Sequence, residues 1–114
     1  MTGGWLTKMD AARTIEDARS VCRDLNTIFA RDGDFPEDTL DEVGRLCEIA
    51  RLVADDRYCH YELYKVERYA AYLLSGDTRH WGRGSIPGHA YLRRLILDLL
   101  RAVDLRLQTQ ALRL

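Results

Sequence analysis

Residues 14–30 read TIEDARSVCRDLNTIFA, and their apolar side chains recur every three or four positions. At about 100° per residue, these side chains fill one arc of a helical wheel, and the charged side chains lie outside it. The arc contains Ile15, Ala18, Val21, Cys22, Leu25, Ile28 and Phe29. The stretch therefore predicts an amphipathic helix, with Thr14 as its N-cap and Thr7 as an alternative, earlier start.

A second stretch repeats this pattern further along the chain. Residues 39–47 read TLDEVGRLC, which resembles TIEDARSVC at 14–22. Two such helices joined near Asp34 predict an antiparallel hairpin, in which Cys22 and Cys47 lie in nearby core layers as buried, neutral thiols. Since each helix has a single apolar face, the hairpin is expected to serve as scaffold.

Two further stretches have helical periodicity, and the last begins near Pro87, a residue suited to a first helical turn. The expected helices span residues 14–31, 37–54, 56–75 and 87–110. Short connections favour antiparallel neighbours, so we predict an all-α, four-helix antiparallel bundle that forms one domain over residues 1–114. This domain includes a flexible N-terminal segment (1–6) and an irregular loop (75–88). A three-helix bundle with the second and third helices fused is the alternative.

The composition argues against several classes of protein. The chain of 114 residues is 46% hydrophobic and 31% charged, and it has no apolar run long enough for a membrane span or a secretory signal. We therefore expect a cytoplasmic protein that does not act at a membrane. Three cysteines without a C-x-x-C pair favour neither a disulfide scaffold nor a zinc site, and we expect no metal and no cofactor.

The net charge of −1 hides an asymmetry along the chain. Residues 1–74 carry 10 basic and 15 acidic side chains, whereas residues 75–114 carry 7 basic and 3 acidic ones. Either the two parts complement each other within the bundle, or the bundle has two faces of opposite sign, one of which meets a partner.

A stripe of tyrosines is the most informative feature of the third helix. The stripe contains Tyr58, Tyr61, Tyr69 and Tyr72, together with Lys65. Tyrosine combines a large apolar ring with a polar hydroxyl, which suits a surface that binds another protein, in a homodimer or on a docking face. The alternative is that the rings pack against the fourth helix or against Trp5.

The connection SGDTRHWGRGSIPG, residues 75–88, is a second candidate for binding. Its glycines let the backbone approach a partner closely, and Arg79, Trp81 and Arg83 are residue types that often anchor protein interfaces. Arginine beside an aromatic ring also suits single-stranded nucleic acid. The alternative is an ordinary connection with Trp81 folded onto the core.

Residues 83–89, RGSIPGH, carry an arginine and a histidine with five residues between them. This spacing resembles the Arg-x(4–6)-His motif of HEPN ribonucleases, which are also small helical bundles. The resemblance implies a metal-independent ribonuclease in which His89 acts as a neutral base on a 2′-hydroxyl and Arg83 binds a phosphate.

An acidic run precedes the second helix and includes Asp32, Asp34, Glu37, Asp38, Asp41 and Glu42. Turn formation and favourable charge at a helix N-terminus account for this run. The alternative is a patch that mimics phosphates and engages a nucleic-acid-binding protein.

Together these features favour a non-catalytic protein-binding module, such as a small inhibitor, antitoxin, immunity protein or phage anti-defence protein. Its partner would be a larger protein or a second copy of the chain. The alternatives are the HEPN-like ribonuclease and a nucleic-acid-binding regulator, and the near-neutral net charge counts against the regulator.

Overall fold

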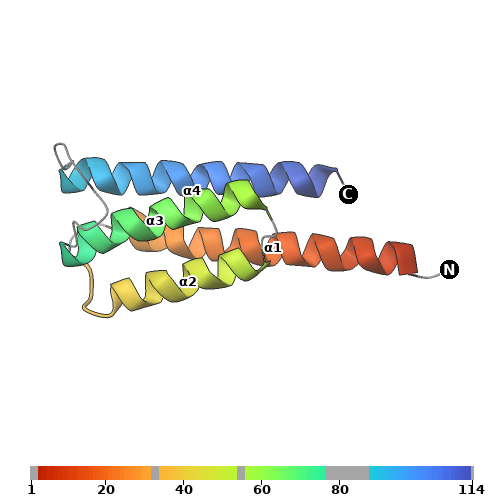
Figure 1. Cartoon of the computed structure of the whole chain (residues 1–114), viewed down its shortest axis with the longest axis horizontal. Helices are drawn as coiled ribbons and strands as arrows, with labels where there is room; N and C mark the ends of the chain where they lie inside the picture. The colour runs from red at the N-terminus through yellow and green to blue at the C-terminus, as the bar shows by residue number, and fades with distance from the viewer. Residues whose placement is uncertain (1–2, 32–33, 54–55, 77–87, 114) are drawn as a thin grey trace.

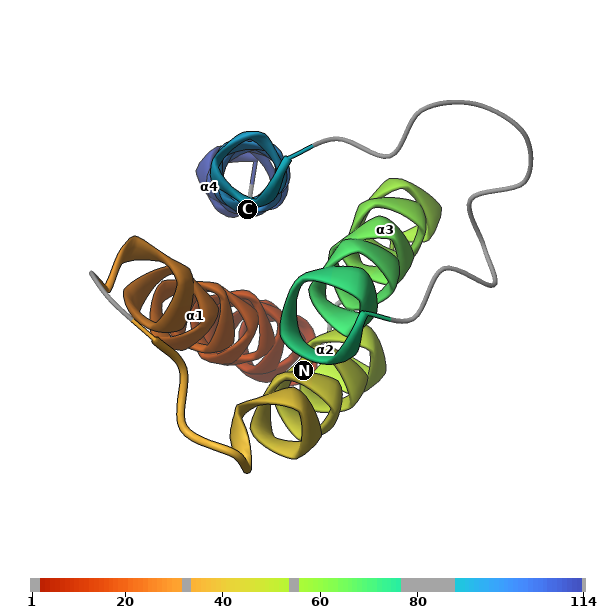
Figure 2. The ribbon, with the colours of Figure 1, turned by 90° about the vertical axis from the view of Figure 1, so that its left-hand side faces the viewer.

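The computed structural model describes residues 3–31, 34–53, 56–76 and 88–113, with the backbone alone for residues 3–11 and Val53. It contains four helices: α1 (Gly3–Ala30), α2 (Thr39–Val53), α3 (Arg57–Ser75) and α4 (His89–Leu112). Successive helices run in opposite directions (Figure 1). Each helix contacts two neighbours, in the cyclic order α1, α2, α3, α4 and back to α1 (Figure 2). The predicted antiparallel four-helix bundle is confirmed.

The first helix is longer than the sequence pattern predicts. It begins at Gly3 rather than at Thr14, so residues 3–6 are helical and not a separate flexible segment. Thr14 lies inside the helix because the residues immediately before it, Ala11, Ala12 and Arg13, are strong helix formers that continue it backwards. The N-terminal part of α1 projects beyond the end of α4 and beyond the α2–α3 connection (Figure 1).

The other helix ends follow from local hydrogen bonds. In front of α2, the Thr39 N–H donates to the Pro36 carbonyl at 3.1 Å, so residues 37 and 38 form a turn instead of the predicted first helical residues. Asp56 is the N-cap of α3, and its extended backbone separates α3 from α2, so the three-helix alternative is wrong. At the other end of α3, Gly76 adopts the left-handed backbone conformation that ends many helices. Glycine adopts this conformation more readily than other residues do.

Side chains from all four helices fill one core. The core cluster comprises Ala18, Cys22, Leu25, Ile28, Phe29, Val43, Leu46, Cys47, Ala50, Cys59, Leu63, Val66, Ala70, Ile96, Leu100, Val103 and Leu107. On α1 these positions match the apolar arc predicted from the sequence. Burial of that arc therefore determines which side of α1 faces the core. No helix among the described residues has both the length and the apolar character needed to cross a membrane.

Polar contacts tie neighbouring helices together at their margins. Arg51 of α2 lies 2.7 Å from Glu67 of α3, and Arg19 of α1 lies 2.9 Å from Asp104 of α4. Asp56 makes the densest set of contacts. Its carboxylate accepts hydrogen bonds from the backbone N–H groups of Tyr58 and Cys59 at 2.8 and 3.2 Å, and from the side chains of Arg106 and Gln110 on α4.

These donors determine the charge state of Asp56. Burial alone would raise the pKa of Asp56, but the hydrogen bond from Arg106 and the N–H donors of Cys59 and Tyr58 outweigh it, so the pKa lies below its ordinary value. The charged carboxylate therefore stabilises the fold.

We predict that Asp56→Ala lowers the free energy of unfolding by about 1–3 kcal/mol, because it removes both the N-cap of α3 and a charged acceptor for α4. Asp56→Asn should cost less, since asparagine also caps helices. A carboxylate with a lowered folded-state pKa contributes stability above its unfolded-state pKa of about 3.9, and this contribution is lost as the pH falls through the folded-state pKa. The loss of unfolding free energy in Asp56→Ala, relative to the wild type, should therefore be greatest at neutral pH and become smaller below about pH 4.

Urea unfolding followed by circular dichroism measures these differences. The exposed Asp24 on α1 provides the control, because Asp24→Ala removes a carboxylate of the same kind without a cap. Two results would contradict the role of Asp56 as a charged cap. One is an equal loss of unfolding free energy in Asp56→Ala and Asp24→Ala, and the other is a loss in Asp56→Ala that does not change with pH.

Candidate functional site

The outer surface of α3 and α4 exposes large aromatic and apolar side chains. Tyr58 and Tyr61 of α3 are 43% and 60% exposed, and Tyr91 and Leu105 of α4 are 56% and 55% exposed. We call these four residues, together with Lys65, the α3–α4 face. Tyr58 and Leu105 line one shallow groove of about 340 Å³ with Ala102, Arg106 and Thr109, so the two helices contribute to a continuous surface.

The predicted tyrosine stripe divides into two parts. Tyr58 and Tyr61 are exposed, whereas Tyr69 packs against the core and Tyr72 is half-buried. The ring of Tyr72 meets His89 of α4 edge-on, with 5.9 Å between the ring centroids. The inner tyrosines of the stripe thus pack within the bundle, as the alternative interpretation expects, and its outer tyrosines face solvent, where binding to another protein stays a prediction.

Cations lie over the tyrosine rings of α3. Lys65 Nζ is 4.4 Å from the centroid of Tyr61, and the Arg106 guanidinium is 5.5 Å from that of Tyr58. Arg68 lies between Tyr64 and Tyr69, 5.8 and 5.7 Å from their centroids. Such contacts hold the rings in place without burying them, which reduces the entropy lost when a partner binds.

Sequence reasoning missed several exposed residues. Tyr64 and Tyr91 are exposed but were not part of the predicted stripe. Tyr91 precedes Asp98 and Leu105 by multiples of seven residues, a spacing that places the three on one side of α4 and could have identified it. The expectation of a single apolar face on the second helix is wrong, since Ile49 and Leu52 are also exposed on α2.

The second predicted binding segment cannot be placed. Arg79, Trp81 and Arg83 lie in residues 77–87, outside the described part of the chain. Their proposed contacts therefore stay predictions, as does the ribonuclease hypothesis, which requires Arg83 beside His89. The described ends of this connection are Gly76, which caps α3, and Gly88, which precedes α4.

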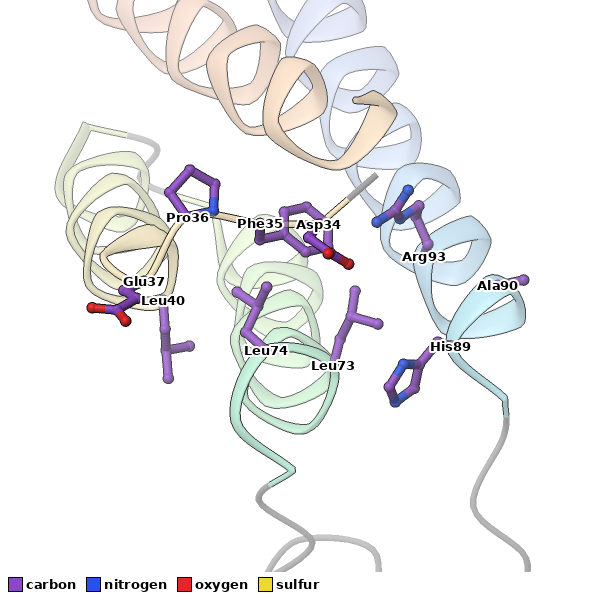
Figure 3. A pocket seen from close by; sticks show the side chains of 10 residues that line it. All are labelled: Asp34, Phe35, Pro36, Glu37, Leu40, Leu73, Leu74, His89, Ala90 and Arg93. Atoms are coloured by element: carbon purple, nitrogen blue, oxygen red, sulfur yellow. The ribbon is translucent and has the colours of Figure 1, made fainter. Parts of the chain in front are cut away.

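An open cleft of about 670 Å³ lies at the end of the bundle where α1 meets α2 and α3 meets α4 (Figure 3). Phe35, Leu73 and Leu74 give it an apolar floor. His89 and Arg93 approach from α4, and Asp34, Pro36 and Glu37 from the α1–α2 connection. The cleft therefore has a basic wall facing an acidic one.

The basic side chains of this cleft already have partners. Arg93 donates a hydrogen bond of 2.9 Å to the Arg31 carbonyl, and its guanidinium lies 4.5 Å from the centroid of Phe35. His89 contacts Tyr72. These contacts join α4 to α1 and α3, so the geometry supports a structural role for the cleft.

The acidic run is spread over the turn and the start of α2. Asp34 and Glu37 border the cleft, Asp38 accepts the Glu42 N–H at 3.1 Å through its carbonyl, and Asp41 and Glu42 occupy the first turn of α2. Asp32 lies outside the described residues. Within the described part of the chain, no three histidine, cysteine or acidic side chains group as metal ligands would.

The three cysteines are buried and unpaired with one another. A thiolate at Cys22 would oppose ionisation of Cys47, and one at Cys59 would oppose ionisation of Cys22, so these side chains lie near one another, in agreement with the predicted nearby layers of Cys22 and Cys47. Burial raises the pKa of Cys22 and Cys47 to about 12 and that of Cys59 to about 11, with Asp104, Glu67 and Asp56 respectively adding to the shift. A thiol with so high a pKa is a poor nucleophile at neutral pH.

Comparisons of the chain with protein-family models, with curated proteins and with solved structures found no match. The exposed side chains of the α3–α4 face are therefore the main indication of function.

We predict that all three thiols of the native protein resist Ellman's reagent at pH 8, because they are buried and protonated. Addition of denaturant should release three equivalents of rapid labelling. Rapid labelling of one thiol in the native protein would show that it is accessible and ionised, and would contradict its position in the core.

Proposed function

We propose that this chain is a non-catalytic protein-binding module that docks on a partner protein through the α3–α4 face. Of the eight large apolar or aromatic side chains that are exposed among the described residues, six belong to α3 and α4: Tyr58, Tyr61, Tyr64, Tyr91, Leu105 and Leu112. This concentration on one half of the bundle is the observation that supports the proposal.

The chemistry of the face also supports docking on a protein. Tyrosine and arginine are favoured at protein interfaces, where a ring is buried and its hydroxyl still forms a hydrogen bond. The cations over Tyr58 and Tyr61 hold the two rings before any partner arrives. A small inhibitor, antitoxin, immunity or phage anti-defence protein would use such a face to cover part of a larger protein.

We predict that Tyr61→Ser combined with Tyr91→Ser weakens partner binding about tenfold or more, because it removes one aromatic anchor from each helix. Both side chains are mostly exposed, so the helical circular dichroism spectrum should be unchanged. Tyr69 is unsuitable for this test because it packs against the core. The measurement is retention of a partner from an extract of the source organism on immobilised protein, followed by titration of the purified partner.

Ile49→Ser combined with Leu52→Ser is the matched control. Ile49 and Leu52 are exposed on α2, and Ile49 lies roughly opposite Arg51, whose side chain contacts α3. The control variant should bind like the wild type. Binding that survives loss of the tyrosines, or that fails equally in the control, would contradict docking through the α3–α4 face.

A further inference from the structure

We propose that the partner presents an acidic protein surface to the α3–α4 face. This inference rests on the proposed function and adds the chemistry of the partner to it. It follows from how the ion pairs of α3 and α4 are buried.

Two ion pairs lie along this face, and in each pair the acid is buried and the base is more exposed. Lys65 Nζ lies 3.4 Å from Glu62 Oε1, and the two side chains are 26% and 10% exposed. Arg106 Nε lies 3.1 Å from Asp56 Oδ2, and these side chains are 51% and 8% exposed. Because a partner can reach the cation but not the carboxylate, each pair presents positive charge to the outside.

The ion pairs elsewhere in the bundle differ in this respect. On α1, Arg23 Nη2 lies 2.7 Å from Glu16 Oε1, and the side chains are 53% and 58% exposed. Between α2 and α3, Arg51 and Glu67 are 31% and 27% exposed. Each of these pairs presents both charges about equally, so it gives a partner no preferred sign.

Each pair on the face also carries one exposed tyrosine. The result is two units of the same design, Glu62–Lys65–Tyr61 and Asp56–Arg106–Tyr58. In both units a partner carboxylate would bind the cation and accept a hydrogen bond from the tyrosine hydroxyl. Apolar groups beside that carboxylate would cover the ring.

Most of the surrounding charges are also positive. Arg57 of α3 and Arg94 of α4 are exposed, and Arg68 lies between Tyr64 and Tyr69. Asp98 of α4 is the exposed acid on this side, since Glu67 and Asp104 are engaged by Arg51 and Arg19. The potential outside the face is therefore positive, which favours an acidic partner and speeds its association.

The same charges argue against two other occupants. A two-fold homodimer through this face would bring the cations of one copy against those of the other. Tight binding to nucleic acid depends on neutralising many phosphates along a strand, whereas the two units supply two cations, Lys65 and Arg106. An acidic protein surface can bind the cations and accept hydrogen bonds from the tyrosine hydroxyls.

The test selects peptides from a random-sequence library displayed on phage, using the immobilised full chain. We expect the enriched peptides to be rich in aspartate and glutamate, with aromatic or aliphatic residues between them. A synthetic copy of the strongest peptide is then titrated by fluorescence anisotropy. The key variant is Lys65→Gln with Glu62→Gln, which removes the exposed cation and leaves the net charge of the chain unchanged.

The matched control is Arg23→Gln with Glu16→Gln, which removes an evenly exposed pair. We expect the first variant to bind the acidic peptide about tenfold more weakly and the control to bind it within about twofold of the wild type. Circular dichroism and thermal unfolding verify that both variants are folded. Equal effects of the two variants would overturn the inference.

Three further results would also overturn it. One is a selection in which acidic peptides are not enriched. Another is a single-stranded RNA oligonucleotide that binds this face more tightly than the selected peptide does. The third is a dimer, detected by light scattering, that Tyr61→Ser with Tyr91→Ser dissociates. The same variant separates this inference from the proposed function. If the selected peptides carry no net negative charge but bind the tyrosine variant more weakly, docking through the α3–α4 face is supported and an acidic partner is contradicted. If the selected peptides bind the tyrosine variant as tightly as the wild type, the proposed function is contradicted.

Discussion

The carboxylate of Asp56 joins three parts of the bundle at one point. It ends the α2–α3 connection, caps α3 through two backbone N–H groups, and accepts hydrogen bonds from Arg106 and Gln110 near the end of α4. These contacts fix the position of α4 along α3. That position places Leu105 and Arg106 beside Tyr58 and, at the other end of the seam, His89 beside Tyr72. The α3–α4 face therefore depends on this buried acid.

The polarity of the face has the same origin. Carboxylates have short side chains and lie close to the backbone, where N–H donors and neighbouring residues cover them. Lysine and arginine have long apolar stems that let the charged group reach solvent. When Asp56 and Glu62 are buried at the seam, their partners Arg106 and Lys65 extend outwards over the tyrosine rings. An ion pair that is neutral in sum thus gives a surface with a definite sign.

The helices and their apolar sides could be predicted from the sequence. Successive residues of a helix are rotated by about 100° around its axis, and this rotation determines which side chains share a face. Asp56 as a cap and the end of α3 before Gly76 were predictable for similar reasons of local backbone chemistry. The start of α1 was not, because alanine and other helix formers carry the helix through Thr14 without a recognisable cap. The divided role of the tyrosines was also unpredictable, since the exposure of Tyr61 and the burial of Tyr69 depend on where α4 packs. The burial of Glu62 depends on that packing too.

The core and the exposed α3–α4 face have separate physical bases. Burial of the apolar arcs around Cys22, Cys47 and Cys59 holds the four helices together, while the exposed residues of α3 and α4 contribute little to that core. Docking should therefore change the solvent exposure of one half of the bundle and leave the other half as it was. Hydrogen–deuterium exchange of the full chain, with and without a saturating concentration of the selected acidic peptide, tests this claim most directly. We expect slower exchange in residues 57–65 and 91–106 and no change in residues 15–30 and 39–53. Slower exchange confined to α1 and α2, or to the end cleft around Phe35 and His89, would contradict it.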